Sequence, residues 1–274
     1  MQFSVVCSSG IGDALILLIV SHHLKKQGYL VKTITPHRFG RWLDSSYVFD
    51  QKPDPSDALF LQINSSSEAL QMRKTHSKVY TFFGSHRIRL PLHQGFDFFA
   101  NPHQTMVKNV IESLRFFFHI DATPENGVTP FEGLTYMKFP KRIVIHTGSG
   151  SLDRCWDLRK FESFSSWAQD EGWDPIFLPQ FPTLEEMLSF IYESGFFLGN
   201  DSGPGHIASY FQIPHIIIGK SKKQMRLWRP GWLQGAILTP PSYIPNFRGC
   251  KLREKFWRSW ISTQSVIDQF QKIL

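Results

Sequence analysis

Short apolar runs alternate with helix-forming stretches along the second half of the chain, and each run ends at a loop rich in small and polar residues. Apolar runs bounded in this way are typical of buried strands, and the stretches between them are long enough for helices. Because a helix between two strands returns the chain to the same end of a sheet, the alternation predicts a parallel sheet. The expected strands are 142–146, 175–179, 195–199, 213–218 and 235–239, and the expected helices are 157–170, 183–193 and 204–211.

The first half of the chain shows the same alternation and predicts a second parallel sheet. Between the halves, residues 121–140 contain three prolines and two glycines, which mark a linker. The sequence therefore predicts an α/β fold with two Rossmann-like, doubly wound domains, the first at 1–125 and the second at 141–258, joined by a linker at 126–140. The strands expected in the first half are 2–7, 29–34, 58–63 and 78–83, and the helices are 14–26, 38–43, 65–74 and 104–119.

The loop after the strand at 195–199 carries small and polar residues at the start of a helix. The unpaired N–H groups and the positive dipole end of a helix start favour an anion, so a phosphate is an expected ligand here. The candidate residues are Asp201, Ser202, Gly203, Gly205 and His206. The alternative is an ordinary capped helix, in which Asp201 or Ser202 bonds to its own backbone.

A second loop of the same design follows the strand at 142–146. It offers Thr147, Ser149, Gly150, Ser151 and one cation, Arg154, before the next helix. Loops at the ends of parallel strands meet at the carboxyl edge of the sheet, where α/β proteins bind their ligands. We therefore expect the two loops to form one pocket for a phosphate-bearing donor.

The turn after the first strand brings two glycines and a carboxylate to the start of the first helix. A dinucleotide-binding fingerprint requires a third glycine where Leu15 stands, so that interpretation is excluded. We interpret Gly10 and Gly12 as positions that let the backbone approach a substrate, beside Asp13 at the helix start. The alternative is that Asp13 only caps the helix.

Three segments of the chain carry a resemblance to a known family. The segments Gly-Ile-Gly-Asp at 10–13, Gly-Ser-Gly-Ser-Leu-Asp-Arg-Cys-Trp at 148–156 and Gly-Asn-Asp-Ser-Gly-Pro-Gly-His-Ile-Ala at 199–208 resemble the signatures of the glycosyltransferase family 9 heptosyltransferases, in order and in spacing. The chain departs from the family after the strand at 175–179, where roughly one strand-loop-helix unit is missing. It also carries Arg154 where the family typically has lysine, which preserves the charge.

The resemblance implies a GT-B fold, in which two Rossmann-like domains face each other across a cleft and the last helix, within 259–274, packs back on the first domain. It implies an inverting, metal-independent glycosyltransferase that moves heptose from ADP-heptose to a hydroxyl of a lipopolysaccharide core or a similar glycan, with Asp13 as the general base. The donor-binding residues are then Thr147, Ser149, Gly150, Ser151, Arg154, Asp201, Ser202, Gly203, Gly205 and His206. The alternative function is a non-catalytic relative that binds a nucleotide sugar and serves as a scaffold.

By the same resemblance, Gly10 and Gly12 are expected to face the substrate on the acceptor side. Arg87 and Arg89 follow the strand at 78–83, where they face an acidic acceptor or form part of an ordinary solvated surface. No Asp-x-Asp pair occurs, so we expect no metal and no cofactor, and Arg154 with the helix dipoles neutralises the leaving group.

Charge and cysteine content set the expected compartment. The formal net charge is +7 and three scattered cysteines show neither a zinc-site spacing nor a disulfide framework, which fits a reduced, bacterial cytoplasm. The apolar run at 14–20 is too short for a membrane span. Residues 247–260 interleave cations with aromatics, which suits peripheral contact with the anionic inner membrane or, alternatively, an amphipathic connection packed on the protein body; no nucleic acid partner is expected.

Overall fold

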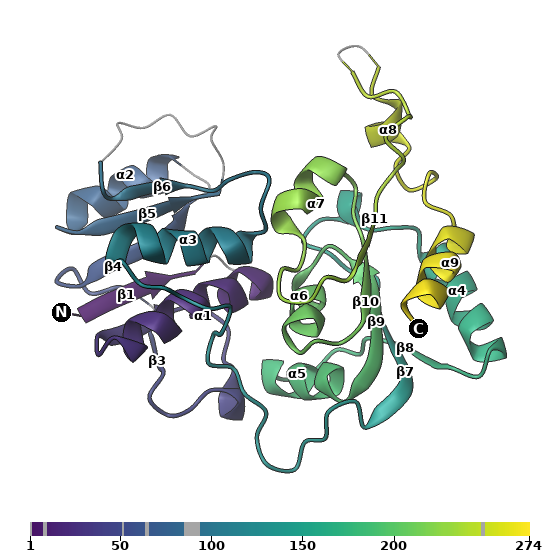
Figure 1. Ribbon diagram of the computed structural model, residues 1–274, viewed down its shortest axis with the longest axis horizontal. Helices are drawn as coiled ribbons and strands as arrows, with labels where there is room; N and C mark the ends of the chain where they lie inside the picture. Colours follow the sequence, from purple (N-terminus) through teal and green to yellow (C-terminus); the bar gives the residue numbers. More distant parts are fainter. Residues whose placement is uncertain (1, 8–9, 51, 64–65, 85–93, 248–249) are drawn as a thin grey trace. The chain divides into compact units, whose positions relative to one another are not determined.

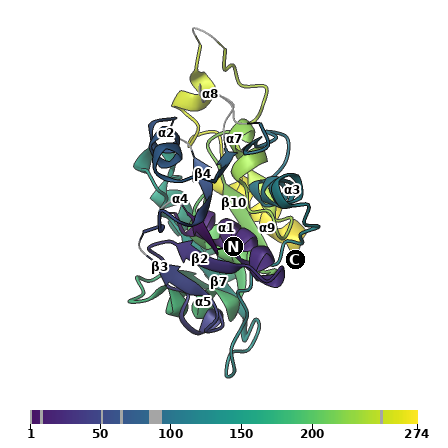
Figure 2. The same ribbon diagram turned by 90° about the vertical axis from the view of Figure 1, so that its left-hand side faces the viewer.

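The computed structural model describes residues 2–7, 10–50, 52–63, 66–84, 94–247 and 250–274. The chain divides into two compact units, each built on a parallel sheet covered by helices (Figures 1 and 2). Unit 1 comprises Met1–Glu132 with Thr183–Glu185, and unit 2 comprises Gly133–Pro182 with Glu186–Leu274. The predicted α/β class with two parallel-sheet domains is confirmed.

The sheet of unit 1 has the strand order β3-β2-β1-β4-β5-β6, and every pair is parallel. The chain starts in the middle of the sheet, winds out to β3, and then returns to β4 on the other side of β1. The topological switch point therefore lies between β1 and β4. The strands are β1 Gln2–Val6, β2 Leu30–Ile34, β3 Val48–Asp50, β4 Ala58–Ile63, β5 Val79–Phe83 and β6 Asp97–Phe99, and the helices are α1 Ile11–Lys26, α2 Ser66–Thr75 and α3 Met106–Phe118, with a 3₁₀ turn η1 at Gly40–Trp42.

The core of unit 1 is formed where α1 and α3 meet the sheet. Residues 14–20 of α1 are completely buried, as expected for a helix that is apolar on all sides. At the end of α3, Phe117 packs edge-on against Phe60 and Phe118 against Phe3, with ring centroids 5.8 and 5.4 Å apart. Phe117 and Phe118 therefore pack against buried rings of the core, whereas Phe116 is 48% exposed.

The sheet of unit 2 has the strand order β11-β10-β9-β7-β8 and is also parallel throughout, with its switch point between β7 and β9. On the side of β7 away from the switch point, the described residues form one strand, β8, whereas two strands, β2 and β3, lie on the corresponding side of β1 in unit 1. The sheet of unit 2 is thus one strand narrower on this side than the sheet of unit 1. The strands are β7 Phe139–His146, β8 Asp174–Phe177, β9 Ser194–Asn200, β10 His215–Ile218 and β11 Ala236–Leu238, and the helices are α4 Leu158–Asp170, α5 Leu184–Tyr192, α6 Gly203–Tyr210, α7 Lys222–Trp228, α8 Leu252–Lys255 and α9 Thr263–Ile273, with a 3₁₀ turn η2 at Leu152–Arg154.

The C-terminal helix α9 belongs to unit 2. Its apolar face, Val266, Ile267 and Phe270, is buried in the core of this unit, and Phe270 packs edge-on against Phe164 of α4 and Phe196 of β9. The apolar stripe of α9 is thus filled by aromatic partners from its own unit, and the expected packing of 259–274 on the first domain stays a prediction.

Candidate functional site

Asp13 lies at the switch point of unit 1, in the first turn of α1 directly after β1. Gln62, near the end of the neighbouring strand β4, donates its Nε2–H to Asp13 Oδ1 at 2.9 Å. In open α/β sheets, ligands bind in the crevice beyond the strand ends at this point. The structure therefore brings a carboxylate and a buried amide together where a substrate is expected.

The N-cap of α1 is Gly10, so the alternative that Asp13 is the N-cap is wrong. A Cβ atom at Gly10 would lie 3.1 Å from Asp13 Oδ2, a tight contact. The missing side chain at Gly10 thus makes room for the carboxylate. Gly12 is buried in the same turn. Burial, and then the charge of Asp13, raises the pKa of the nearby Cys7 thiol, so this thiol stays protonated.

The predicted acceptor-side arginines, Arg87 and Arg89, lie outside the described residues. A cation that the sequence analysis missed lies at the same edge of the sheet. Arg38 follows β2, the neighbour of β1, and is exposed, with Nη1 donating to the carbonyl of Thr35 at 3.2 Å. The available signal was a positively charged residue four residues after the strand expected at 29–34.

In unit 2, the two predicted donor loops meet at Asn200, the buried last residue of β9. Its Nδ2 donates to the carbonyl of Thr147 at 2.6 Å, and its Oδ1 accepts from the backbone N–H of Trp156 at 2.8 Å. Asn200 therefore fixes both ends of the loop after β7 to the end of β9. The sequence analysis read Asn200 only as part of a motif and did not assign it this role.

The loop after β7 brings hydroxyls and a guanidinium to this edge. Ser149 Oγ donates to the carbonyl of Ser151 at 2.6 Å, and Arg154 Nε donates to Ser151 Oγ at 3.1 Å. A Cβ at Gly150 would lie 2.7 Å from Arg154 Nη2, so the guanidinium lies close to this glycine and a side chain here would displace it. These four predicted residues are thus assembled in one loop.

The outer side of this loop is held by the segment before α9. Trp257 is buried and donates its Nε1–H to the carbonyl of Asp153 at 3.1 Å. Arg258 donates from Nε to the carbonyl of Cys155 at 2.6 Å and from Nη2 to that of Leu152 at 2.5 Å. This part of the cationic and aromatic segment is therefore an amphipathic connection packed on the protein body.

The start of α6 is the second predicted anion-binding element. Ser202 is the N-cap residue, but its side chain makes no capping hydrogen bond and donates instead to the carbonyl of Asn200 at 3.0 Å. Asp201 Oδ2 accepts from Gln224 Nε2 at 3.1 Å. The interpretation of Ser202 as the side-chain cap of its own helix is thus wrong.

The remaining predicted residues of α6 differ in where they lie. Gly203 is the first helical residue. A Cβ at Gly205 would lie 2.6 Å from Ile217 Cδ1, so this glycine allows α6 to pack closely on β10. His206 is buried, with its ring edge-on to Trp232 at a centroid distance of 6.4 Å. The structure therefore places the last two in the packing of the helix against its unit.

His146, the last residue of β7, is a further side chain at the switch point of unit 2 that sequence reasoning missed. It is half-buried, and burial lowers the pKa of its imidazole to about 4. A Cβ at Gly148 would lie 3.2 Å from its Cε1, so the loop passes close over the ring. At neutral pH this site therefore presents an uncharged imidazole.

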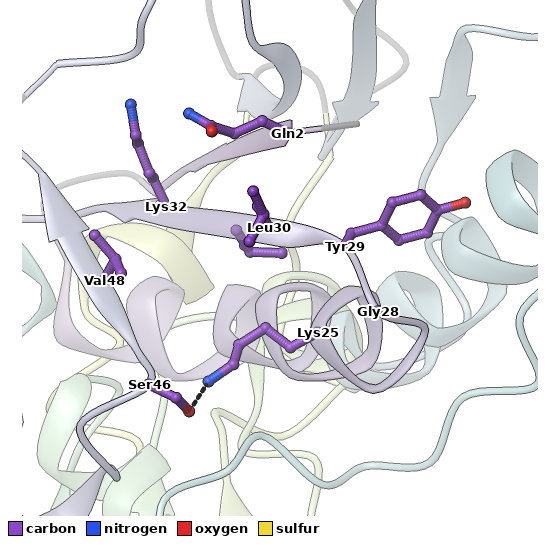
Figure 3. A pocket seen from close by; sticks show the side chains of 9 residues that line it. Gln2, Lys25, Gly28, Tyr29, Leu30, Lys32, Ser46 and Val48 are labelled. Carbon is purple, nitrogen blue, oxygen red and sulfur yellow. Dashed lines mark hydrogen bonds between the residues drawn. The ribbon is translucent and has the colours of Figure 1, made fainter.

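A pocket of about 370 Å³ lies at the opposite, amino edge of the unit 1 sheet, beside Leu30 and Val48 (Figure 3). Two lysines line it, but both already have acceptors. Lys25 Nζ donates to Ser46 Oγ at 2.5 Å, and Lys32 Nζ lies 3.7 Å from the buried carboxylate of Asp57. The pocket is separate from the switch point and adds no residue to the candidate site.

Two further features bear on the chemistry. Within the described ranges, His, Cys, Asp and Glu side chains form no cluster of three or more that is arranged to hold a metal ion. Among the residues that the structure places, no helix combines the length and the apolar character that a membrane span requires.

The fold was compared with known proteins. No family model matches the sequence, and no curated protein matches it either. Solved structures do match: the E. coli heptosyltransferase WaaC with ADP (12% identity, TM-score 0.68, 100% of both chains), a glycosyltransferase of family 9 from Veillonella parvula DSM 2008 (15%, 0.62, 99% and 96%), and the iron-containing dodecameric glycosyltransferase TibC from enterotoxigenic E. coli H10407 (11%, 0.61, 99% of this chain and 75% of that one).

These matches span the chain, including residues 36–140, which contain none of the three segments that carry the sequence resemblance. The expectation drawn from the three sequence segments is confirmed at the level of the fold: the chain has the fold of the glycosyltransferase family 9 heptosyltransferases.

Proposed function

We propose that this protein is an inverting glycosyltransferase that moves a sugar from a nucleoside diphosphate sugar to a hydroxyl of a glycan acceptor. The observation that carries the proposal is the carboxylate of Asp13, held by Gln62 at the switch point of unit 1. By resemblance, the donor is ADP-heptose and the acceptor is a lipopolysaccharide core or a similar glycan. The proposal includes a GT-B arrangement, in which the two units face one ligand across a cleft.

In the proposed reaction, Asp13 accepts the proton of the acceptor hydroxyl as its oxygen attacks the anomeric carbon. The bond from that carbon to the diphosphate breaks, and the new bond forms on the opposite face, which inverts the configuration. Gln62 fixes the orientation of the carboxylate. Arg154, the hydroxyls of Ser149 and Ser151, and the start of α6 stabilise the departing diphosphate.

We propose that this stabilisation needs neither a metal nor a cofactor. Arg154 supplies a full positive charge, and its planar guanidinium can bind two phosphate oxygens at once. The start of α6 adds the partial positive charge of a helix dipole. TibC, which has this fold, is iron-containing, so turnover of this protein should be compared with and without chelator.

A second candidate function is a non-catalytic scaffold that binds the nucleotide sugar. The observation that favours it is the reduced sheet of unit 2, which lacks the outer strand beyond β8 among the described residues. A scaffold retains donor binding through the loop that Asn200 holds, but it shows no transfer to any acceptor.

We further propose that the protein works at the inner face of the cytoplasmic membrane, through an arm to which the described residues 240–247 and 250–260 belong. Figures 1 and 2 show α8, within this arm, standing away from the sheet of unit 2. Large apolar side chains are exposed along the arm and alternate with cations, a combination that suits an anionic lipid surface. They are Tyr243, Phe247, Leu252, Phe256 and Trp260, with Lys251, Arg253 and Lys255 among the cations.

The function is tested by replacing Asp13 with Asn. This substitution keeps the size of the side chain, so folding and the affinity for ADP should remain as in the wild type. Sugar transfer should fall by at least about a hundredfold, because loss of a general base typically costs 10² to 10⁴ in rate. Transfer by Asp13→Asn at the wild-type rate would remove Asp13 from the mechanism, and a wild-type protein that binds ADP without any transfer would favour the scaffold.

A further inference from the structure

An ion pair crosses the carboxyl edge of the unit 2 sheet. Lys220 follows β10 and donates from Nζ to Asp153 Oδ2 at 2.7 Å. Asp153 belongs to the loop after β7. Because β9 lies between β10 and β7 in the sheet, this pair spans the end of β9, where Asn200 and the start of α6 lie. Lys220 and Asp153 are therefore placed at the edge where the donor diphosphate is proposed to bind.

A second cation converges on the same carboxylate through a hydroxyl. Asp153 Oδ1 accepts from Ser151 Oγ at 2.5 Å, and Ser151 Oγ in turn accepts from Arg154 Nε at 3.1 Å. Two cations from different strands thus surround one anion and one hydroxyl. A diphosphate group presents acceptor oxygens to such a pair of cations, and charge-assisted hydrogen bonds of this kind are the strong ones.

The anion at the centre of this arrangement is accessible and charged. The side chain of Asp153 is 63% exposed and that of Lys220 is 29% exposed. Hydrogen bonds from Lys220 and then from Ser151 lower the pKa of Asp153 to about 2, so it is ionised at neutral pH. A fixed carboxylate here repels a phosphate, but a solvent-exposed carboxylate is able to turn away. Lysine, a point charge on a flexible stem, is able to change acceptors.

We propose that Asp153 takes the place of a donor phosphate in the ligand-free protein, and that Lys220 exchanges this carboxylate for a phosphate oxygen when the donor binds. Lys220 is then a second diphosphate ligand beside Arg154. The inference rests on the proposed function, because it assumes a nucleoside diphosphate as the ligand. No covalent step is involved, and the exchange moves only two side chains.

The competing explanation is that the Lys220–Asp153 pair only stiffens the loop. The two explanations differ in sign. If the pair is only structural, losing either partner loosens the loop and lowers the affinity for the ligand. If Asp153 competes with the phosphate, losing Asp153 raises the affinity for the ligand, whereas losing Lys220 lowers it.

Calorimetric titration with ADP and with inorganic pyrophosphate distinguishes the two. Lys220→Gln should lower the affinity for both ligands by at least about tenfold, because a hydrogen bond to a charged group is lost. Asp153→Asn should raise the affinity for both ligands by about twofold to fivefold, the range for an exposed charge pair. Adenosine, which has no phosphate, should be unaffected by Lys220→Gln.

Matched charge changes elsewhere in unit 2 serve as controls. Asp268 and Lys272 are exposed on α9, and Asp268 Oδ1 accepts a hydrogen bond at 2.8 Å from Gln264 Nε2 of the same helix. Asp268→Asn and Lys272→Gln should each change ADP affinity by less than about twofold at physiological salt, where distant exposed charges are screened.

The outcomes separate this inference from the proposed function. Weaker or unchanged binding by Asp153→Asn, in a protein whose wild type binds ADP, overturns the exchange and leaves the proposed function standing. Unchanged binding by Lys220→Gln removes Lys220 from the site. A wild type that binds neither ADP nor pyrophosphate rejects the proposed function and this inference with it. Thermal melting of each variant verifies that it is folded during the titration.

Discussion

Asn200 should be the residue on which the donor loop depends most. Replacement by Ala removes the acceptor for the buried N–H of Trp156 and the donor for the half-buried carbonyl of Thr147. A buried group left without a partner costs about 1–3 kcal/mol, and a carbonyl that water can reach costs less. We therefore expect Asn200→Ala to lower the free energy of unfolding by about 2–4 kcal/mol.

The assay is urea denaturation followed by tryptophan fluorescence, combined with calorimetric titration of ADP. Because the loop is released, ADP affinity should fall together with stability. Asn246→Ala is the matched control, since its Nδ2 donates at 3.1 Å to an exposed carboxylate, Glu254, and should cost less than about 1 kcal/mol. A loss below about 0.5 kcal/mol for Asn200→Ala, or a loss of stability with ADP affinity intact, would refute the role of Asn200 in holding the loop.

Three further predictions address the base, the half-buried His146 and the arm. Gln62→Met removes the donor to Asp13 and should lower the kcat of transfer by roughly a hundredfold, the cost of a misplaced group, while the affinity for ADP stays unchanged. Gln71→Met, on the exposed face of α2, is the control. An unchanged kcat for Gln62→Met contradicts the positioning role. Burial holds the pKa of His146 near 4 in the folded protein, below about 6.5 in the unfolded chain, so the unfolded state binds the proton first and the free energy of unfolding should fall as the pH drops from about 6.5 to 4; His146→Asn should flatten this fall in urea unfolding at several pH values, and an equally steep fall refutes the assignment. Lys251→Gln and Lys255→Gln should each weaken binding to phosphatidylglycerol vesicles about fivefold in a sedimentation assay. Lys52→Gln and Lys74→Gln should leave this binding unchanged, and an equal loss in all four variants would indicate only a general charge effect.

The strands and helices that the sequence predicted were those whose signal is local. The apolar runs at 58–63 and 195–199 recur as β4 and β9 because a strand buried on both faces needs such a run. The strands β3 and β6 were missed, since each has three residues and is stabilised mainly by pairing with a neighbour already in place. The short helix α7 begins with polar residues and offers no apolar run to mark it.

The candidate site divides in the same way. The glycine-containing loops were predicted, because their small and polar residues stand together in the sequence. The partners Gln62 and Lys220 were not, since each lies far along the chain from the carboxylate it contacts, Asp13 or Asp153, and only the order of strands in the sheet brings them together. The apolar stripe of α9 predicts that the helix is buried, but it does not say which residues cover it.

The most direct test of the account is calorimetric titration of the wild type and of Arg154→Ala with a panel of nucleoside diphosphates and their sugars. The account predicts that the wild type binds a diphosphate-bearing ligand, with ADP-linked ligands preferred. Arg154→Ala should weaken that binding by roughly 10-fold to 150-fold, which corresponds to about 1.5–3 kcal/mol for a hydrogen bond to a charged group, and Arg154→Lys should retain part of it. A wild type that binds no member of the panel, or equal affinity in all three proteins, would contradict the claim that unit 2 holds a nucleotide sugar.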